Sequence, residues 1–96
     1  MLLLLCLPTL VQAQLPAKPA KLGQCVACHG ENGRSRIAGT PHLAGQDETY
    51  LVNAISAYRS GSRRAQPMNS LANTLQPRDI AALARWYSRQ PQGAAR

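Results

Sequence analysis

The sequence predicts an all-α domain of three to four helices. Two segments place apolar residues at intervals of three and four, which is the spacing of one helix face. No segment shows the alternation of apolar and polar residues that is typical of strands. The chain has 96 residues, and the first 13 carry no charge. The 83 residues that follow are enough for one small domain and too few for a second hydrophobic core.

Residues 1–13 have the composition of a signal peptide. An apolar run leads to Val11 and Ala13, small residues at the positions that signal peptidase recognises. We therefore expect export to the periplasm, cleavage after Ala13 and a mature domain over residues 14–96. A membrane span needs about 20 apolar residues, so no stable span is expected. Lipid attachment at Cys6 and a buried N-terminal helix are the alternatives.

The first part of the domain combines one short helix with a long loop. Prolines at positions 16 and 19 predict an irregular start. A short helix then follows from about Ala20 into Cys28. Residues 30–45 contain four glycines and one proline with little periodicity, which predicts a loop. Loops of this length inside a compact domain usually serve a function.

The segment from Asp47 to Arg59 has the strongest helical pattern. Asp47 and Glu48 favour the positive end of the helix dipole, and Gly61 provides a stop. Its apolar residues follow helical spacing: Tyr50, Leu51, Ala54, Ile55 and Tyr58.

A polar loop over residues 60–73, with one helical turn at its end, leads to the last helix. Pro77 opens this helix, Asp79 lies near its start, and Pro91 follows its end. One face carries Ile80, Leu83, Ala84 and Tyr87.

The apolar inventory is small for a self-supporting core. The chain has one Trp, three Tyr and no Phe. Small domains of this kind are usually stabilised by disulfides, a metal or a large cofactor. Three cysteines, one of them Cys6 in the leader, cannot form a disulfide framework. A metal or a cofactor is therefore expected.

Residues 25–29 read Cys-Val-Ala-Cys-His, the attachment motif of c-type haem. On one helical turn, Cys25 and Cys28 can reach the two vinyl groups of one haem, and His29 can then bind the iron. The alternatives are a thioredoxin-like dithiol, which needs a preceding strand, and a zinc site that adds His42 to the three motif residues.

Met68 is the candidate for the second axial ligand. It is the only methionine left after the leader is removed, and it lies in a polar loop where core packing is poorly supported. Thioether sulfur is a soft ligand for haem iron. His42 and an open sixth position are the competing possibilities.

Five stretches together resemble a class I bacterial monohaem cytochrome c of the cytochrome c553 or cytochrome c4-domain type. They are CVACHG, PHLAGQ, a helix ending in YRSGSRR, the dipeptide PM, and L-x-x-x-D-I-A-A-L-A-x-W-Y. The resemblance implies a small cytochrome c fold around one haem, with a carbonyl of Pro41 on the imidazole of His29. It places Met68 on the iron and His42 on the proximal side.

Two departures from that pattern affect loop detail. Gln76 and Pro77 stand where relatives usually have a Ser or Asp cap. Asn69 and Ser70 stand where relatives often have Gly or Ala, and Asn69 is a candidate for tuning the reduction potential through a hydrogen bond. Residues expected to pack around the haem are Tyr50, Leu51, Ile55, Tyr58, Leu71, Leu75, Ile80, Leu83 and Tyr87, with Trp86 covering the helix interface.

The net charge of +7 indicates the kind of partner. Arg59, Arg63 and Arg64 precede the Met68 loop and are either a solvated face or a docking rim for an acidic surface on a respiratory complex or dehydrogenase. Nucleic acid is not an expected partner. The function predicted is electron transfer rather than enzymatic catalysis. Alternatives are a cytochrome c subunit of a dehydrogenase or oxidase complex, a gas-binding haem protein and a peroxidase.

Overall fold

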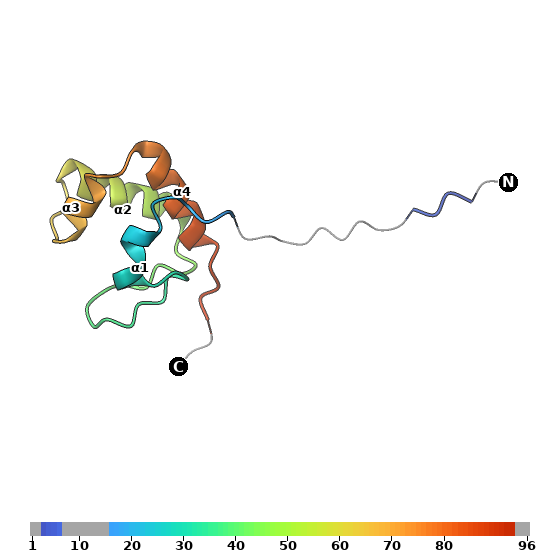
Figure 1. Cartoon of the computed structure of the whole chain (residues 1–96), viewed down its shortest axis with the longest axis horizontal. Helices are drawn as coiled ribbons and strands as arrows, with labels where there is room; N and C mark the ends of the chain where they lie inside the picture. Colours follow the sequence, from blue (N-terminus) through green and yellow to red (C-terminus); the bar gives the residue numbers. More distant parts are fainter. Residues whose placement is uncertain (1–2, 7–15, 94–96) are drawn as a thin grey trace.

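The computed structural model describes residues 3–6 and 16–93. Over these residues the chain forms four helices and no strand (Figure 1), which confirms the all-α prediction. The predicted cleavage point after Ala13 lies outside the described residues. Leu3, Leu4 and Leu5 are exposed and not helical, so the alternative of a buried N-terminal helix finds no support at these positions. No helix in the described part of the chain is long and apolar enough to cross a bilayer.

Helix α1, Gly23–His29, carries the haem motif. It begins about three residues later than predicted. Residues 20–22 form a turn instead, in which the amide of Leu22 donates to the carbonyl of Pro19 at 3.1 Å. Leu22 has helical φ and ψ, and no side chain caps the start of the helix there. The helix ends at Gly30, whose φ of +77° suits glycine.

The loop that follows α1 is closed on itself through Gly33. The carbonyl of Gly33 accepts hydrogen bonds from the amides of Leu43 at 2.7 Å and Ala44 at 3.1 Å. Gly33 has φ of +80°, and a Cβ there would lie 2.6 Å from the nitrogen of Ala44. Only glycine fits this crossing, which brings the two ends of the loop together beneath α1.

Helix α2, Glu48–Ser60, is capped at both ends. The carboxylate of Asp47 accepts a hydrogen bond from the amide of Tyr50 at 2.8 Å, so Asp47 is the N-cap rather than the first helical residue. Gly61, with φ of +86°, ends the helix as predicted. The helical turn expected at the end of the next loop is α3, Met68–Ala72.

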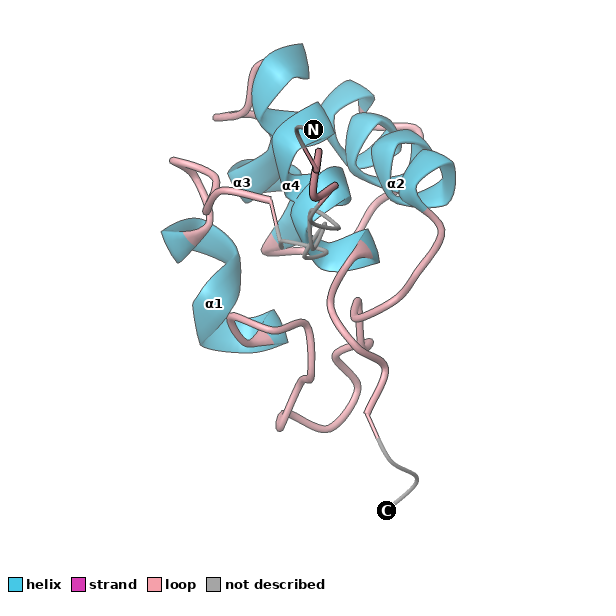
Figure 2. Ribbon diagram, turned by 90° about the vertical axis from the view of Figure 1, so that its right-hand side faces the viewer, coloured by secondary structure: helices cyan, strands magenta, loops and turns pink. Residues whose placement is uncertain are grey.

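Helix α4, Pro77–Ser88, packs against α2 and supplies most of the core (Figure 2). The missing Ser or Asp cap is replaced by Asp79, whose carboxylate accepts a hydrogen bond from the amide of Gln76 at 2.8 Å. The core contains the following buried residues: Leu22, Leu51, Leu75, Ile80, Leu83, Ala84, Trp86 and Tyr87.

Two aromatic side chains of α4 also hold the haem-motif loop. The indole N–H of Trp86 donates to the carbonyl of Glu31 at 2.7 Å, and the hydroxyl of Tyr87 donates to the carbonyl of Gly30 at 2.9 Å. Burial, with smaller contributions from Cys25 and Glu31, raises the pKa of Tyr87, so its hydroxyl stays protonated as a donor. Trp86 therefore does more than cover the helix interface: it fixes the chain immediately after α1.

Candidate haem-binding site

A cavity of about 340 Å³ lies between the helices and is lined by residues from all four of them. This volume is within the range of small-molecule and cofactor sites. The cavity brings together all five residues singled out from the sequence: Cys25, Cys28, His29, Pro41 and Met68. In the sequence these residues span more than 40 positions, so the fold is what assembles them.

Cys25 and Cys28 lie three residues apart on α1, and both are half-buried and free of disulfide bonding. Because they are separated by nearly one helical turn, both thiols contribute to the same wall of the cavity. Burial raises the pKa of the Cys25 thiol to about 11. The folded wall therefore presents Cys25 as a neutral thiol, shielded from water, at neutral pH.

His29, the last residue of α1, is 8% exposed and oriented by the loop. Its Nδ1 lies 3.0 Å from the carbonyl oxygen of Pro41. A carbonyl can only accept a hydrogen bond, so Nδ1 must be the donor. Nε2 then carries the lone pair and is the nitrogen free to bind a metal. This is the contact that the family resemblance implies for Pro41.

Met68, the first residue of α3, is half-buried and lines the same cavity. His42 also reaches the lining but has another partner, because its Nδ1 accepts a hydrogen bond from the amide of Ser35 at 2.9 Å. His42 is exposed and ties the loop together. Within residues 3–6 and 16–93, no cluster of three or more His, Cys, Asp or Glu is placed to bind a metal ion. The alternative of a four-ligand zinc site is therefore not supported.

The rest of the lining is mainly apolar. Of the residues predicted to surround a haem, all except Ile80 line the cavity, and Ile80 lies in the adjoining core. Several residues that were not predicted to surround a haem also line the cavity, from loops or with small side chains: Leu43, Gln46, Ala54, Arg63, Gln66 and Ala72. Ala54 had a signal, because it shares the apolar face of α2. The loop residues had none, since periodicity carries no information there.

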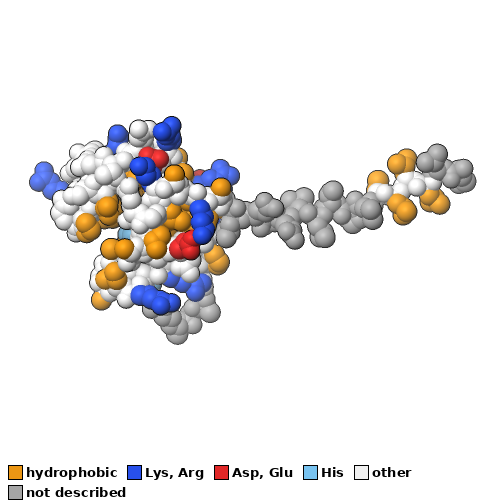
Figure 3. Space-filling model, viewed as in Figure 1, with side chains coloured by type: hydrophobic (Ala, Val, Ile, Leu, Met, Phe, Trp, Pro, Cys, Tyr) orange, Lys and Arg blue, Asp and Glu red, His pale blue; other side chains and the backbone are white. Residues whose placement is uncertain are grey.

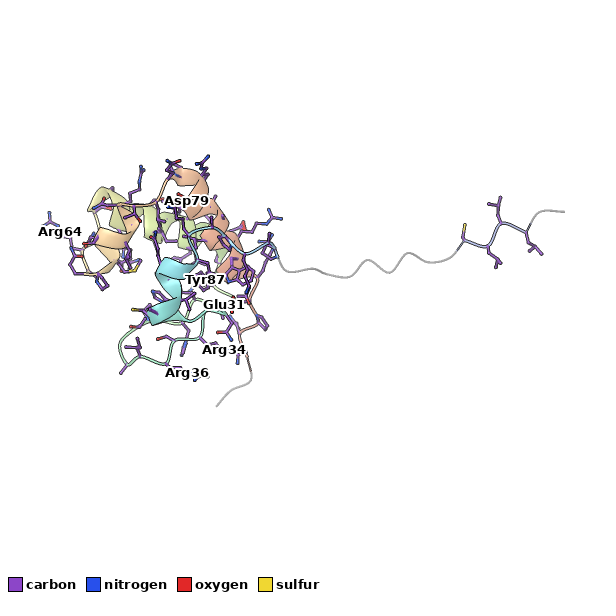
Figure 4. All side chains as sticks on the ribbon, viewed as in Figure 1. Glu31, Arg34, Arg36, Arg64, Asp79 and Tyr87 are labelled. Atoms are coloured by element: carbon purple, nitrogen blue, oxygen red, sulfur yellow. The ribbon has the colours of Figure 1, made fainter. Side chains whose placement is uncertain are left out.

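Among the described residues, Arg63 is the only Lys, Arg, Asp or Glu that lines the cavity. Its guanidinium lies over the ring of Tyr58, 4.6 Å from the ring centroid, a cation–π contact. Its neighbour Arg64 projects away from the domain (Figure 4). On the face shown in Figure 3, hydrophobic side chains lie in the middle and toward the left, and basic side chains are scattered over the face without forming one patch.

These residues fit a c-type haem. The two thiols on one helical turn could take up its two vinyl groups, Nε2 of His29 and the sulfur of Met68 are candidate iron ligands in the same cavity, and the apolar walls suit a porphyrin. The fit rests on the donor set and on the orientation that Pro41 imposes on His29.

Comparison with known proteins identifies the family of the chain. The family model of cytochrome c matches residues 17–90. Cytochrome c-554(548) of Halomonas halodenitrificans is 45% identical over 73 residues, which cover 73% of this chain and 88% of that protein. A thiosulfate dehydrogenase electron acceptor of Thiomonas intermedia is 36% identical over 83 residues, which cover 84% of this chain and 38% of that protein.

A solved structure confirms the predicted small cytochrome c fold. Reduced cytochrome c4 from Pseudomonas stutzeri matches with a TM-score of 0.66 and 30% identity, over 77% of this chain and 44% of that chain. The chain therefore spans most of the length of cytochrome c-554(548) and less than half of the other two relatives.

Proposed function

Since the chain belongs to the cytochrome c family and is an electron carrier rather than an enzyme, we propose that it carries electrons in the periplasm through one haem c. The haem would be attached through Cys25 and Cys28, and His29 and Met68 would bind its iron. Export requires the leader, and we propose cleavage after Ala13. The N-terminal sequence of protein recovered from the periplasm tests both statements.

When bound, the haem supplies an iron that alternates between Fe(II) and Fe(III). The chain supplies the attachment points, the iron ligands and the apolar surroundings. Cys25 and Cys28 would hold the haem through two thioethers, each formed by adding a thiol S–H across one vinyl group. Pro41 holds the proton on Nδ1 of His29 and keeps Nε2 available. The apolar lining excludes water and lowers the local dielectric, which influences the potential.

The observation that carries the proposal is the 3.0 Å contact between His29 Nδ1 and the carbonyl of Pro41, in a cavity that also holds Cys25, Cys28 and Met68. A histidine in a core or on a surface does not need this arrangement. Here one nitrogen is fixed by the backbone and the other is left for a ligand beside two thiols.

The test is the visible and near-infrared spectrum of protein exported together with haem-attachment machinery. We expect a low-spin spectrum with the weak ferric sulfur-to-iron band, and no reaction of the ferrous protein with CO. Met68→Ala should lose the band and bind CO promptly, because the sixth position opens. A high-spin wild type that binds CO promptly would contradict ligation by Met68 and favour a gas-binding protein.

A second candidate is a cytochrome subunit held in a dehydrogenase or oxidase complex. Val26 and Ile37, which are 37% and 48% exposed, line a hollow beside Cys28 together with Glu31, Arg34 and Arg36, so this surface offers a partner both apolar and charged contacts. The relative named thiosulfate dehydrogenase electron acceptor suggests a dehydrogenase as the electron donor. Size-exclusion chromatography of a gently prepared periplasmic extract separates the two candidates. A free carrier elutes at the size of the single chain, and a subunit elutes with its partner.

A further inference from the structure

The side chain of Asn69, next to Met68, makes three hydrogen bonds, all to the backbone, and these use both hydrogens of its amide group. Its Nδ2 donates to the carbonyl of Tyr58 at 2.9 Å and to the carbonyl of Arg63 at 2.7 Å. Its Oδ1 accepts from the amide of Ala65 at 2.8 Å. All three partners precede Met68, and they belong to α2 and to the loop that leads to α3.

These bonds connect α2, the loop that follows it and the start of α3. The carbonyl of Tyr58 lies in the last turn of α2, where helix carbonyls have no partner of their own within the helix. Arg63 and Ala65 lie in the loop between the helices, and the amide of Asn69 also donates to the carbonyl of Ala65 at 3.1 Å. Asn69 therefore ties α2, the loop and the first turn of α3 into one unit beside Met68.

We propose that Asn69 is a positioning residue that keeps the sulfur of Met68 in place as an iron ligand; this rests on the proposed role of Met68. Helix α3 has only five residues, which is too short to be stable alone. In the part of the chain that the structure describes, no other side chain makes three hydrogen bonds to the backbone of α2 and this loop. The hydrogen bonding of Asn69 to the backbone also leaves no amide hydrogen for the sulfur itself.

The chemistry at this position requires an amide. Aspartate has the same shape but no donor, so its oxygens would face the carbonyls of Tyr58 and Arg63 and repel them. Alanine leaves those two carbonyls and the amide of Ala65 without a partner. Glutamine keeps both donors and the acceptor but places them one methylene farther from the backbone.

The experiment compares Asn69→Asp and Asn69→Ala with Asn73→Asp and Asn73→Ala in the haem-loaded protein. Asn73 is exposed at the other end of α3, and its side chain makes no hydrogen bond to any described residue, so its variants match the change in charge and size. Two readouts report the bond between sulfur and iron: the intensity of the ferric sulfur-to-iron band, and the rate at which imidazole enters the ferric site.

We expect both Asn69 variants to weaken the band and to bind imidazole about tenfold faster than wild type, because each lost hydrogen bond raises the population of the open loop severalfold. Both Asn73 variants should match wild type, and Asn69→Gln should fall in between. If the Asn69 variants match the Asn73 variants, the inference is wrong. If wild type has no sulfur-to-iron band, the proposed role of Met68 fails instead. If Asn69→Ala yields no loaded protein, the band and rate of Asn69→Gln decide.

Discussion

At the scale of single residues, the site depends on backbone groups as much as on side chains. The carbonyl of Pro41 determines which nitrogen of His29 is free, and the amide of Ser35 occupies Nδ1 of His42. Two histidines in one short segment are thereby given different roles by their backbone partners. His29 can bind a metal through Nε2, while His42 secures the loop.

Gly33 is the residue on which that loop depends, and its substitution tests the loop directly. We expect Gly33→Ala to destabilise the haem-loaded protein by about 1–2 kcal/mol for the positive φ and a further 1–3 kcal/mol for the crowding of Ala44 and Tyr87. The added Cβ would lie 2.6 Å from the nitrogen of Ala44 and 3.0 Å from the ring of Tyr87. Urea unfolding followed at the haem band measures the loss.

Gly39→Ala is the matched control for this substitution. Gly39 has φ of +83°, nearly the same as Gly33, but a Cβ there would meet nothing within 4 Å. It should therefore lose only the part that comes from φ. Equal losses for the two variants would show that the close crossing at Gly33 has no energetic weight.

At the scale of elements, the accuracy of the predicted helix bounds depends on whether the sequence signals each helix end. The helical spacing predicts α2 and α4 to within a residue or two, and Gly61 marks the end of α2 as expected. The start of α1 was placed too early, because propensity does not show that residues 20–22 form a turn on Pro19. The spacing of the C-x-x-C-H motif predicts that Cys25, Cys28 and His29 belong to one site.

Other parts of the site could not be predicted from spacing. The role of Asn69 and the position of Arg63 in the lining both depend on the path of the loop between α2 and α3. That path is set by hydrogen bonds from side chains to distant backbone groups, which leave no periodic trace in the sequence. In the sequence, Asn69 is marked only by its difference from the family pattern. That difference alone does not test the predicted tuning of the reduction potential.

The start of α4 provides a test of capping. Asp79→Ala removes the carboxylate that accepts from the amide of Gln76 and that lies at the positive end of the helix. We expect a loss of about 1 kcal/mol in the free energy of unfolding. Asp79→Asn keeps an acceptor oxygen and should retain most of the stability. If thermal unfolding shows the same loss for both variants, the negative charge matters and the hydrogen bond does not.

At the scale of the whole molecule, carboxylates are few and already engaged. Glu31 pairs with Lys18, Glu48 pairs with Arg89, and Asp47 and Asp79 cap helices. Within residues 3–6 and 16–93, the remaining arginines therefore have no carboxylate partner: Arg34, Arg36, Arg59, Arg63, Arg64, Arg78 and Arg85. A net charge of +7 is only partly offset by two haem propionates, so the loaded protein stays basic.

This charge predicts how the protein reacts with charged redox partners. We expect oxidation of the ferrous protein by the anion ferricyanide to slow as ionic strength rises, because salt screens the attraction. Oxidation by a cationic cobalt(III) phenanthroline complex should accelerate over the same range. Stopped-flow kinetics measures both rates, and the same trend with both oxidants would show that the net charge does not steer the reaction.

The location of the docking rim is tested by two arginines with the same charge and different positions. Arg63 lines the cavity, whereas Arg85 is exposed on α4 and does not. If electrons leave near the cavity, Arg63→Gln should slow the ferricyanide reaction at low salt roughly severalfold, and Arg85→Gln should change it by less than about twofold. The difference should disappear at high salt, where the Debye length falls to about 3 Å. Equal effects of the two substitutions would mean that the protein steers its partners through total charge, and that the arginines before Met68 are an ordinary solvated face.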